Sequence, residues 1–256
     1  MIIDAYNTTQ NVRGRSDYLS GGKPGDPPLP HVPFDVDRIL TRMDAAGVDR
    51  AMVCSLGQRI ENDFIAQLVR ENPRLFGFGQ VMPQWDDAEE QIRAFAREPG
   101  MAGLKLHPTL HGYHFADHGL LDPIFQVCQD ENLIVLVNAL DDPFAGPFAI
   151  EEISRNFPEV PLLIAHMGVV WNMPEALLVS ERHDHIYLET SATLLADVRK
   201  AYGRVGAERI VMGTEWPGHD FDLERMKIAK AILDDADRAL IEGGNMERLL
   251  AGREGR

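Results

Sequence analysis

Short apolar runs recur along the chain at fairly regular intervals, and segments of helical periodicity separate most of them. The runs are rich in Val, Ile, Leu and Phe. Such composition is typical of strands that are buried on both faces in a parallel sheet. We therefore predict strands at residues 2–4, 50–54, 76–82, 103–107, 133–139, 162–168, 186–191 and 210–214.

Between these runs, apolar residues stand three or four positions apart, as on the buried face of an amphipathic helix. The pattern is clear at residues 36–43, 64–69, 92–96 and 226–233. Eight strands that alternate with about eight helices predict an α/β fold, a (β/α)8 TIM barrel, as a single domain over residues 1–256. A doubly wound open sheet is the alternative, but residues 4–8 lack the glycine-rich turn that usually follows its first strand.

One polar segment, residues 10–35, interrupts the alternation and contains four glycines and five prolines. Loops of this length inside a compact domain are usually either functional or disordered. Because it follows the first strand, it would lie over the carboxyl-terminal mouth of a barrel. We interpret it as a lid or pocket wall, and a mobile surface insertion is the alternative.

Charge and cysteine content narrow the class of protein. The chain has 40 acidic and 25 basic residues, a formal net charge of −15, which argues against binding nucleic acid or an anionic membrane. Cys54 and Cys128 lie in apolar or helix-like segments without zinc-site spacing, so we expect two buried thiols. The N-terminus lacks a secretory signal, and no apolar run approaches the roughly 18 residues of a membrane helix. We therefore expect a cytoplasmic protein.

The chemistry of a parallel barrel takes place at the carboxyl ends of its strands. The polar residues at or just beyond the predicted strand ends are Asp4, Tyr6, Thr8, Ser55, Gln58, Arg59, Lys105, His107, Asn138, Asp141, His166, Glu189, Ser191 and Glu215. Lys105 can point into the barrel or outward. An inward lysine needs a buried partner, for which Glu189 and Glu215 are candidates.

Several of these residues lie in recognisable motifs. In chain order the motifs are NPRLFGF (72–78), GLKLHP (103–108), LIAHMG (163–168), GTEWP (213–217) and GNMERLL (244–250). Together they resemble the amidohydrolase-related family, the branch of the amidohydrolase superfamily that contains metal-dependent hydrolases, lactonases and non-oxidative decarboxylases. The resemblance covers nearly the whole chain and implies a barrel enzyme that acts on a small molecule.

The departures from the family pattern concern its metal site. That site usually takes a His-x-His pair after the first strand, a fifth-strand histidine and an eighth-strand aspartate. This sequence has Tyr6, Thr8, Asn138 and Glu215 at those positions and keeps only the sixth-strand histidine, His166. Tyr, Thr and Asn are poor zinc ligands, so we expect no metal at the usual position. A relocated divalent metal (zinc) site near His107, His166 and Glu215 is the alternative.

The remaining groups suit proton transfer or attack on an already reactive electrophile. We predict that His166 acts as a general base and that Glu215 orients its imidazole. Tyr6, Asn138 or Lys105 can stabilise a developing oxyanion. We therefore assign catalytic roles to His166, Glu215, Lys105 and Tyr6.

A second set of mouth residues is predicted to contact the substrate. These residues are Thr8, Arg59, His107, Asn138 and Glu189. An arginine binds a carboxylate well through two parallel hydrogen bonds, and the candidates for that contact are Arg13, Arg15 and Arg59.

Three functions remain open at this point. The first, which we predict, is metal-independent hydrolysis of a small cyclic or activated carboxylic compound such as a lactone. The second is a lyase or isomerase activity, for example non-oxidative decarboxylation by His166 and Glu215. The third is a catalytically inactive relative that binds a small molecule or a partner, which the replacements at Tyr6, Thr8 and Asn138 favour. The resemblance also allows a homodimer.

Overall fold

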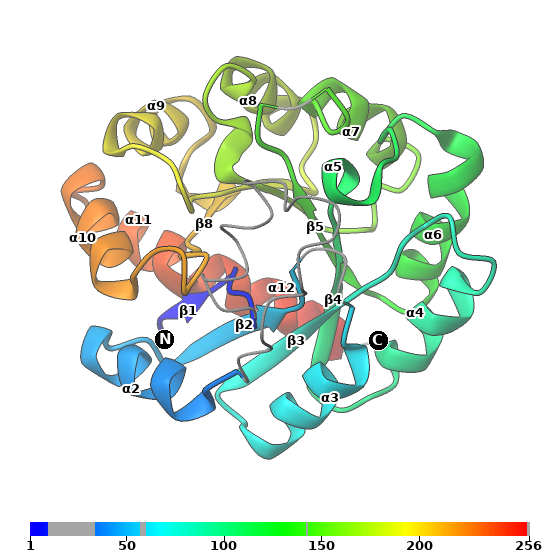
Figure 1. Ribbon diagram of the computed structural model, residues 1–256. Coiled ribbons are helices and arrows are strands. Elements are labelled where there is room, and N and C mark those ends of the chain that lie inside the picture. Colours follow the sequence, from blue (N-terminus) through cyan, green and yellow to red (C-terminus); the bar gives the residue numbers. More distant parts are fainter. Residues whose placement is uncertain (10–33, 57–59, 142, 255–256) are drawn as a thin grey trace, which may run out of the picture.

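Eight parallel strands form one sheet in chain order, which confirms the predicted (β/α)8 barrel (Figure 1). The computed structural model describes residues 1–9, 34–56, 60–141 and 143–254. The strands are β1 (Ile3–Asp4), β2 (Arg50–Cys54), β3 (Leu75–Gln80), β4 (Met101–Leu106), β5 (Ile134–Asn138), β6 (Leu162–Ala165), β7 (Ile186–Glu189) and β8 (Ile210–Val211). Of the predicted lid, residues 10–33 lie outside the described residues, so its role stays a prediction.

The barrel closes between β1 and the segment after β8 through backbone hydrogen bonds. Ala5 N donates to Met212 O at 2.8 Å, and Thr8 N donates to Trp216 O at 2.9 Å. These bonds lie just beyond the two short strands. The carboxyl ends of the first and last strands therefore meet at the same rim.

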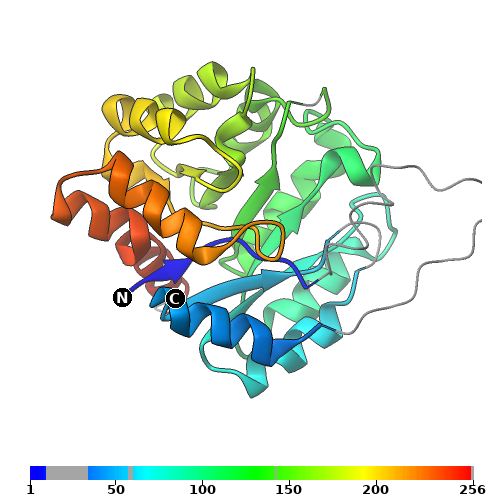
Figure 2. The same cartoon turned by 60° about the vertical axis from the view of Figure 1, so that its left-hand side comes forward.

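A ring of helices surrounds the strands (Figure 1). The helices are α2 (Val36–Ala46), α3 (Asn62–Glu71), α4 (Ala88–Ala96), α5 (Pro108–His111), α6 (His118–Asp130), α7 (Pro147–Ser154), α8 (Met173–Arg182), α9 (Leu195–Val205), α10 (Phe221–Ala231), α11 (Asp235–Ala239) and α12 (Asn245–Glu254). Helix α12 packs beside β1 across the amino-terminal end of the barrel (Figure 2), where Met246 and Leu250 join the interior core. That end is closed, so the opposite end carries the mouth.

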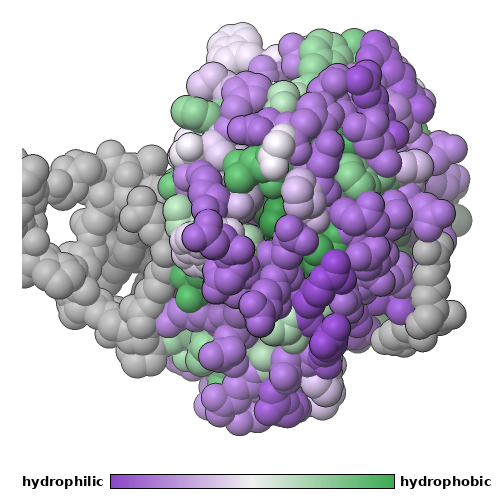
Figure 3. Space-filling view, turned by 90° about the vertical axis from the view of Figure 1, so that its right-hand side faces the viewer, coloured by the Kyte–Doolittle hydropathy of each residue, from purple (hydrophilic) through white to green (hydrophobic). Residues whose placement is uncertain are grey.

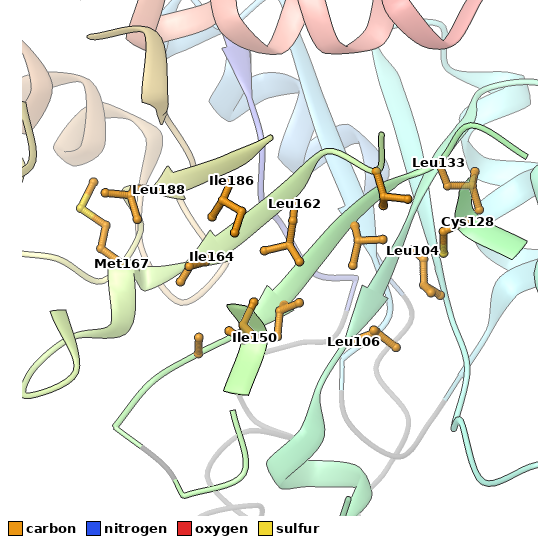
Figure 4. Packing of buried hydrophobic residues seen from close by; sticks show 14 of the residues in the cluster. Leu104, Leu106, Cys128, Leu133, Ile150, Leu162, Ile164, Met167, Ile186 and Leu188 are labelled. Carbon is orange, nitrogen blue, oxygen red and sulfur yellow. The ribbon is translucent and has the colours of Figure 1, made fainter. Parts of the chain in front are cut away.

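The strands bury one apolar layer on each face. On β6, Leu163 and Ala165 face the barrel interior, whereas Leu162 and Ile164 pack outward against the helices. Figure 4 shows this outer layer, in which side chains of neighbouring strands stack together with residues such as Ile150 from α7. Burial on both faces explains why the strands have near-continuous apolar sequences.

Several strands end earlier than the apolar runs predict, because the backbone turns at the mouth. After β6, His166, Met167 and Gly168 have φ values of 61°, 52° and 69°. The left-handed conformation cannot continue a strand. After β8, Glu215 has a φ of 59°. These turns bring the side chains that follow the strands toward the mouth.

The predicted buried face of the helix after the last strand is wrong. Helix α10 spans Phe221–Ala231 and buries Phe221, Glu224 and Ile228. Met226 and Leu233, which the periodicity placed inside, are 50% and 82% exposed. A buried glutamate interrupts the apolar face here, so spacing of apolar residues alone indicated the wrong stripe.

Hydrophilic residues cover most of the molecular side that lies to the right in Figure 1, with small apolar areas between them (Figure 3). This surface agrees with the composition, in which 25% of the residues are charged. Within the described residues, none of the helices combines the length and the apolar composition that crossing a membrane requires.

Candidate active site

The last inward-facing positions of several strands are polar, whereas the positions below them are apolar. On β5, Ile134 and Leu136 belong to the apolar interior, and Asn138 follows them at the end of the strand. Because strand side chains alternate between faces, the same pattern brings other end residues into one layer. The fully buried members of this layer are Gln80, Lys105 and Glu189. We call it the polar layer of the mouth.

A buried lysine lies at the centre of this layer. Lys105 Nζ donates a hydrogen bond to the Tyr6 hydroxyl and lies 4.3 Å from the centroid of the Tyr6 ring. The Tyr6 hydroxyl in turn donates to Asn138 Oδ1 at 3.2 Å. Lys105 therefore points inward. Its hydrogen bond to Tyr6 and its position over the ring offset part of the cost of burying an ammonium.

His166 adjoins the same chain of hydrogen bonds. Its Nε2 lies 3.3 Å from Asn138 Oδ1, and its Nδ1 lies 2.9 Å from Ser191 Oγ. The His166 and Tyr6 rings are in contact, with centroids 5.6 Å apart. Asn138 Oδ1 is thus shared between the Tyr6 hydroxyl and the imidazole. In the structure Tyr6, Lys105, Asn138 and His166 lie next to one another, although 160 positions of the sequence separate the first from the last.

The hydrogen-bond network assigns the protons of His166. Ser191 Oγ donates to Glu189 Oε2 at 2.7 Å, so its lone pair is available to accept a proton from His166 Nδ1. Nε2 faces Asn138 Oδ1, which also accepts from the Tyr6 hydroxyl and has no hydrogen to donate, so this contact is a hydrogen bond only when Nε2 carries a proton. The network therefore offers an acceptor for a proton on each ring nitrogen.

Glu189 lies behind His166 and accepts three hydrogen bonds. Its Oε1 accepts from Ser191 N at 2.7 Å, and its Oε2 accepts from Ser191 Oγ and from His166 N, the latter at 3.1 Å. Burial raises the pKa of Glu189, and the nearby His166 and the Ser191 hydrogen bonds oppose that rise. These bonds connect the Glu189 carboxylate to Ser191 and His166, and its predicted substrate contact stays a prediction.

The carboxylate of Glu189 fits only because residue 213 is glycine. A Cβ at Gly213 would lie 2.2 Å from Glu189 Oε1 and 3.1 Å from Tyr6 Cβ. The GTEWP motif thus contributes two features to the site. Gly213 leaves room for the Glu189 carboxylate, and Glu215 supplies a second carboxylate.

Glu215 lies after β8 with its backbone N donating to Tyr6 O at 2.6 Å. Its Oε2 lies 3.9 Å from His219 Nε2. The sequence predicted that Glu215 orients His166. In the structure Ser191 contacts Nδ1 and Asn138 contacts Nε2, so Ser191 also lies where it can orient the ring, and the orienting role of Glu215 stays a prediction. Ser191 stood at a predicted strand end, two residues after Glu189, but nothing in its local sequence marked that role.

The predicted substrate-contacting residues differ in where they lie. Thr8 is buried, and its hydroxyl donates weakly to Trp216 O at 3.5 Å. His107 follows β4 and is 8% exposed. Burial, with a further contribution from Lys105, lowers the pKa of His107 well below its usual value, so its imidazole is neutral. Arg13, Arg15 and Arg59 lie outside the described residues.

The side chains at the expected metal positions do not fit zinc. Tyr6 and Asn138 hydrogen-bond each other, and the Tyr6 hydroxyl also accepts from Lys105. Zinc prefers thiolate, imidazole and carboxylate ligands. In the described part of the chain, no group of three or more His, Cys, Asp or Glu side chains is arranged to hold a metal. The structure does not assemble His107, His166 and Glu215 into the relocated site.

The fold and the site together describe a barrel enzyme with its chemistry at the carboxyl-terminal mouth. A sequence model described as amidohydrolase matches residues 18–251. The chain therefore belongs to the amidohydrolase family, as the motifs indicated. No curated protein matches the sequence.

Solved structures with the same fold span nearly the whole chain. The 5-carboxyvanillate decarboxylase of Sphingomonas paucimobilis is 18% identical over 98% of both chains, with a TM-score of 0.77. A dihydroxybenzoic acid decarboxylase of Polaromonas sp. JS666, with bound manganese and the inhibitor 2-nitroresorcinol, is 17% identical over 98% of this chain and 96% of its own, with a TM-score of 0.75. A probable 2-pyrone-4,6-dicarboxylic acid hydrolase of Acinetobacter baumannii is 13% identical over 98% and 99%, with a TM-score of 0.72. At these identities the likeness shows the fold.

Proposed function

We propose that this protein is a non-oxidative decarboxylase of small aromatic carboxylic acids that works by acid–base chemistry without a bound metal. The observation that carries the proposal is the buried chain of contacts from Lys105 through Tyr6 and Asn138 to His166. It places a fixed cation and an ionisable imidazole in one polar layer. Decarboxylation needs these two elements, whereas hydrolysis also needs an activated water.

In the proposed reaction the imidazolium of His166 protonates the ring carbon that bears the carboxylate. The bond from that carbon to the carboxylate then breaks, its electron pair returns to the ring, and carbon dioxide leaves. The net change is the uptake of one proton and the release of one carbon dioxide. No oxidant or metal enters this balance.

Lys105 is proposed to bind the anionic part of the substrate. A buried ammonium in a low-dielectric site attracts a carboxylate or phenolate strongly. The Tyr6 hydroxyl and the Asn138 amide, which share its hydrogen-bond chain, keep the ammonium at one place in the mouth. The negative charge of the substrate would thus be held beside His166.

Glu189 and Ser191 are proposed to stabilise the imidazolium. The Ser191 hydroxyl connects Glu189 Oε2 to His166 Nδ1 through distances of 2.7 and 2.9 Å. A carboxylate at that position favours the charged ring. His166 can then hold the proton that the ring carbon receives.

Carbon dioxide release tests the proposal directly. Purified protein is incubated with carboxyl-labelled benzoates that carry one or two ring hydroxyls, and trapped carbon dioxide is counted. We expect release by the native protein and a loss of about 10²–10⁴-fold in kcat for His166→Asn. The control His118→Asn, at an exposed ion pair on α6, should keep the native rate. Release that is absent with every acid, or unchanged in His166→Asn, would contradict the proposal.

The metal-free part has its own test. Protein treated with a strong chelator and dialysed is assayed before and after addition of manganese or zinc, with metal content measured on the same sample. We expect equal rates in all samples. Activity that disappears on chelation and returns with a metal would reject this part and leave the decarboxylase assignment in place.

Lactone hydrolysis, the function predicted from the sequence, remains the second candidate. The structural similarity to a probable 2-pyrone-4,6-dicarboxylic acid hydrolase favours it. In that case the Nε2 of His166 would take a proton from water. Loss of the ring absorbance of a pyrone carboxylate without carbon dioxide release would select this function. Thermal stabilisation by such acids without any turnover would select the inactive relative.

A further inference from the structure

An ion pair on helix α10 contacts the loop that follows β7. The pair joins Lys227 and Glu224, with Lys227 Nζ 2.8 Å from Glu224 Oε2, and the two side chains are only 14% and 5% exposed. We propose that this pair positions His166 by holding Ser191, which contacts the imidazole. The inference rests on the proposed function only in taking His166 as the residue that acts, and it assigns a role to two residues of the outer helical ring.

Lys227 donates hydrogen bonds to oxygen atoms at both ends of a short turn, residues 190–193. Its Nζ lies 2.7 Å from Thr190 O, 3.2 Å from Thr193 O and 3.1 Å from Thr193 Oγ1. Thr193 Oγ1 also donates to Thr190 O at 2.6 Å. One cation therefore holds both ends of the turn, and Ser191 lies between them.

Glu224 holds the side chain of the first residue of this turn. Thr190 Oγ1 donates to Glu224 Oε1 at 2.5 Å and accepts from Gly213 N at 3.2 Å. The other carboxylate oxygen pairs with Lys227. Removing one partner of a buried pair leaves the other charge uncompensated. We therefore treat Glu224 and Lys227 as one unit that fixes the turn.

The turn depends on such contacts because its backbone is strained and its outer side is open. Ala192, which follows Ser191, has a φ of 55°, a conformation that is unfavourable for residues other than glycine. Ala192, Thr193 and Leu194 line a hollow of about 260 Å³ together with Lys227, and Leu194 is 70% exposed. Little apolar packing therefore holds the turn from outside. Strained conformations persist only where their surroundings enforce them.

Ser191 connects the turn to the imidazole. Its Oγ lies 2.9 Å and its carbonyl oxygen 3.3 Å from His166 Nδ1. Its backbone N donates to Glu189 Oε1 at 2.7 Å. A shift of the turn would thus displace both the residue that contacts the ring and the carboxylate behind it. Misplacement by about 1 Å can cost about 10²-fold in rate.

The pair also accounts for the unusual buried face of α10. Glu224 lies on that face between Phe221 and Ile228. A buried ion pair is often no more stabilising than apolar side chains of similar size. Stability of the fold therefore gives little reason for a charged pair here, whereas the contacts with the turn give one.

The test observes the His166 ring directly. The full-length protein, labelled with ¹⁵N at histidine, is studied by NMR at pH 8, above the pKa of about 7 to which burial raises Glu224. The His166 signals are identified by their loss in His166→Asn. In the native protein we expect a proton on Nδ1 that exchanges slowly with water, because Ser191 accepts it in a buried site.

Lys227→Met keeps much of the side-chain volume and removes the charge. In this variant the Nδ1 proton should exchange at least about tenfold faster, because the turn opens more readily. For whichever acid the protein turns over, kcat should fall about 10–100-fold with little change in KM. Glu224→Gln should change both readouts in the same direction. The double variant should be no worse than Lys227→Met alone, because the two side chains act as one unit.

The matched control is Lys230→Met, which makes the same change about one turn further along α10, at an exposed lysine. It should keep the native exchange rate and kcat. Equal acceleration of exchange in this control would overturn the inference, since any loss of charge on α10 would then have the effect.

Three other results would also overturn it. They are a native protein without the slowly exchanging Nδ1 proton, native exchange in a folded Lys227→Met or Glu224→Gln variant, and an unchanged kcat despite faster exchange. The two variants are separate, so a folding failure of one leaves the other decisive. The exchange measurement needs no turnover. Absence of carbon dioxide release with the expected exchange rates would therefore reject only the proposed function, and release with unchanged exchange would reject only the positioning role.

Discussion

The packing of Glu189 against residue 213 predicts a large effect for a very small substitution. In Gly213→Ala the new Cβ would lie 2.2 Å from Glu189 Oε1. Ordinary contacts of this kind are more than about 3 Å apart, so the carboxylate must move by about 1 Å. Oε1 accepts the hydrogen bond from Ser191 N at 2.7 Å. A shift of that size breaks this bond and moves the carboxylate away from His166.

Two contributions determine the magnitude. A hydrogen bond to a charged group contributes about 1.5–3 kcal/mol, and its loss leaves the buried carboxylate less well paired. Forcing an extra methyl group into a packed interior costs about 1–3 kcal/mol. We therefore expect Gly213→Ala to lower the free energy of unfolding by about 2.5–6 kcal/mol. Activity should fall as well, because Ser191 and His166 depend on the displaced carboxylate.

Urea unfolding, followed by circular dichroism, measures this free energy. The matched control is Gly203→Ala on α9, where a Cβ would meet nothing within 4 Å. That variant should be as stable as the native protein or up to about 1 kcal/mol more stable, since alanine is the better helix former. The difference between the two variants isolates the close approach at residue 213.

A double substitution identifies the cause. Glu189→Asp shortens the side chain by one methylene and withdraws the carboxylate from residue 213. If the clash with Glu189 is responsible, Gly213→Ala should cost much less in the Glu189→Asp background than in the native one. The reasoning is refuted if Gly213→Ala matches Gly203→Ala in stability, or if its cost is unchanged in that background.

Three further predictions follow from single contacts. Ser191→Ala should lower kcat by about 10–100-fold with little change in KM, whereas Ser191→Thr keeps the hydroxyl and most of the rate; equal rates would reject the positioning role. Burial raises the pKa of Glu224 from 4.5 to about 7 in the folded protein. Between these two pH values the folded protein binds a proton that the unfolded chain has released, so the stability that this proton contributes is lost as the pH rises from 4.5 to 7. Urea unfolding between pH 4.5 and 7.5 should therefore show that the free energy of unfolding of the native protein declines as the pH rises. In Glu224→Gln this decline should be smaller by up to about 3 kcal/mol. Burial raises the pKa of the Cys54 thiol to about 11 and that of Cys128 further, so neither should react with a thiol reagent at pH 8 until the protein unfolds; rapid labelling of the folded protein would contradict this.

Much of the fold was predictable because it depends on local and periodic signals. Apolar runs such as 50–54 coincide with β2, since strands buried on both faces cannot tolerate polar residues. The strand ends were less predictable. The run at 162–168 continues past β6, because Met167 remains apolar and buried while the backbone turns at His166.

The candidate site was predictable as a set of positions but not as a set of contacts. The rule that chemistry lies at the carboxyl ends of strands identified Tyr6, Lys105, Asn138 and His166. It did not indicate that Ser191 contacts the imidazole. That choice depends on which way the backbone turns after each strand, and a single sequence does not specify those turns.

The sequence by itself determined the family, the barrel and the replacement of most of the usual metal-site residues. These follow from composition, periodicity and motifs, which are properties of residues taken in chain order. Only the tertiary structure decided that Lys105 points inward to Tyr6, that Gly213 makes room for Glu189, and that Ser191 contacts His166. Each of these depends on distances between strands that barrel closure sets. Side chains more than 90 residues apart come within hydrogen-bonding distance only when the sheet has closed.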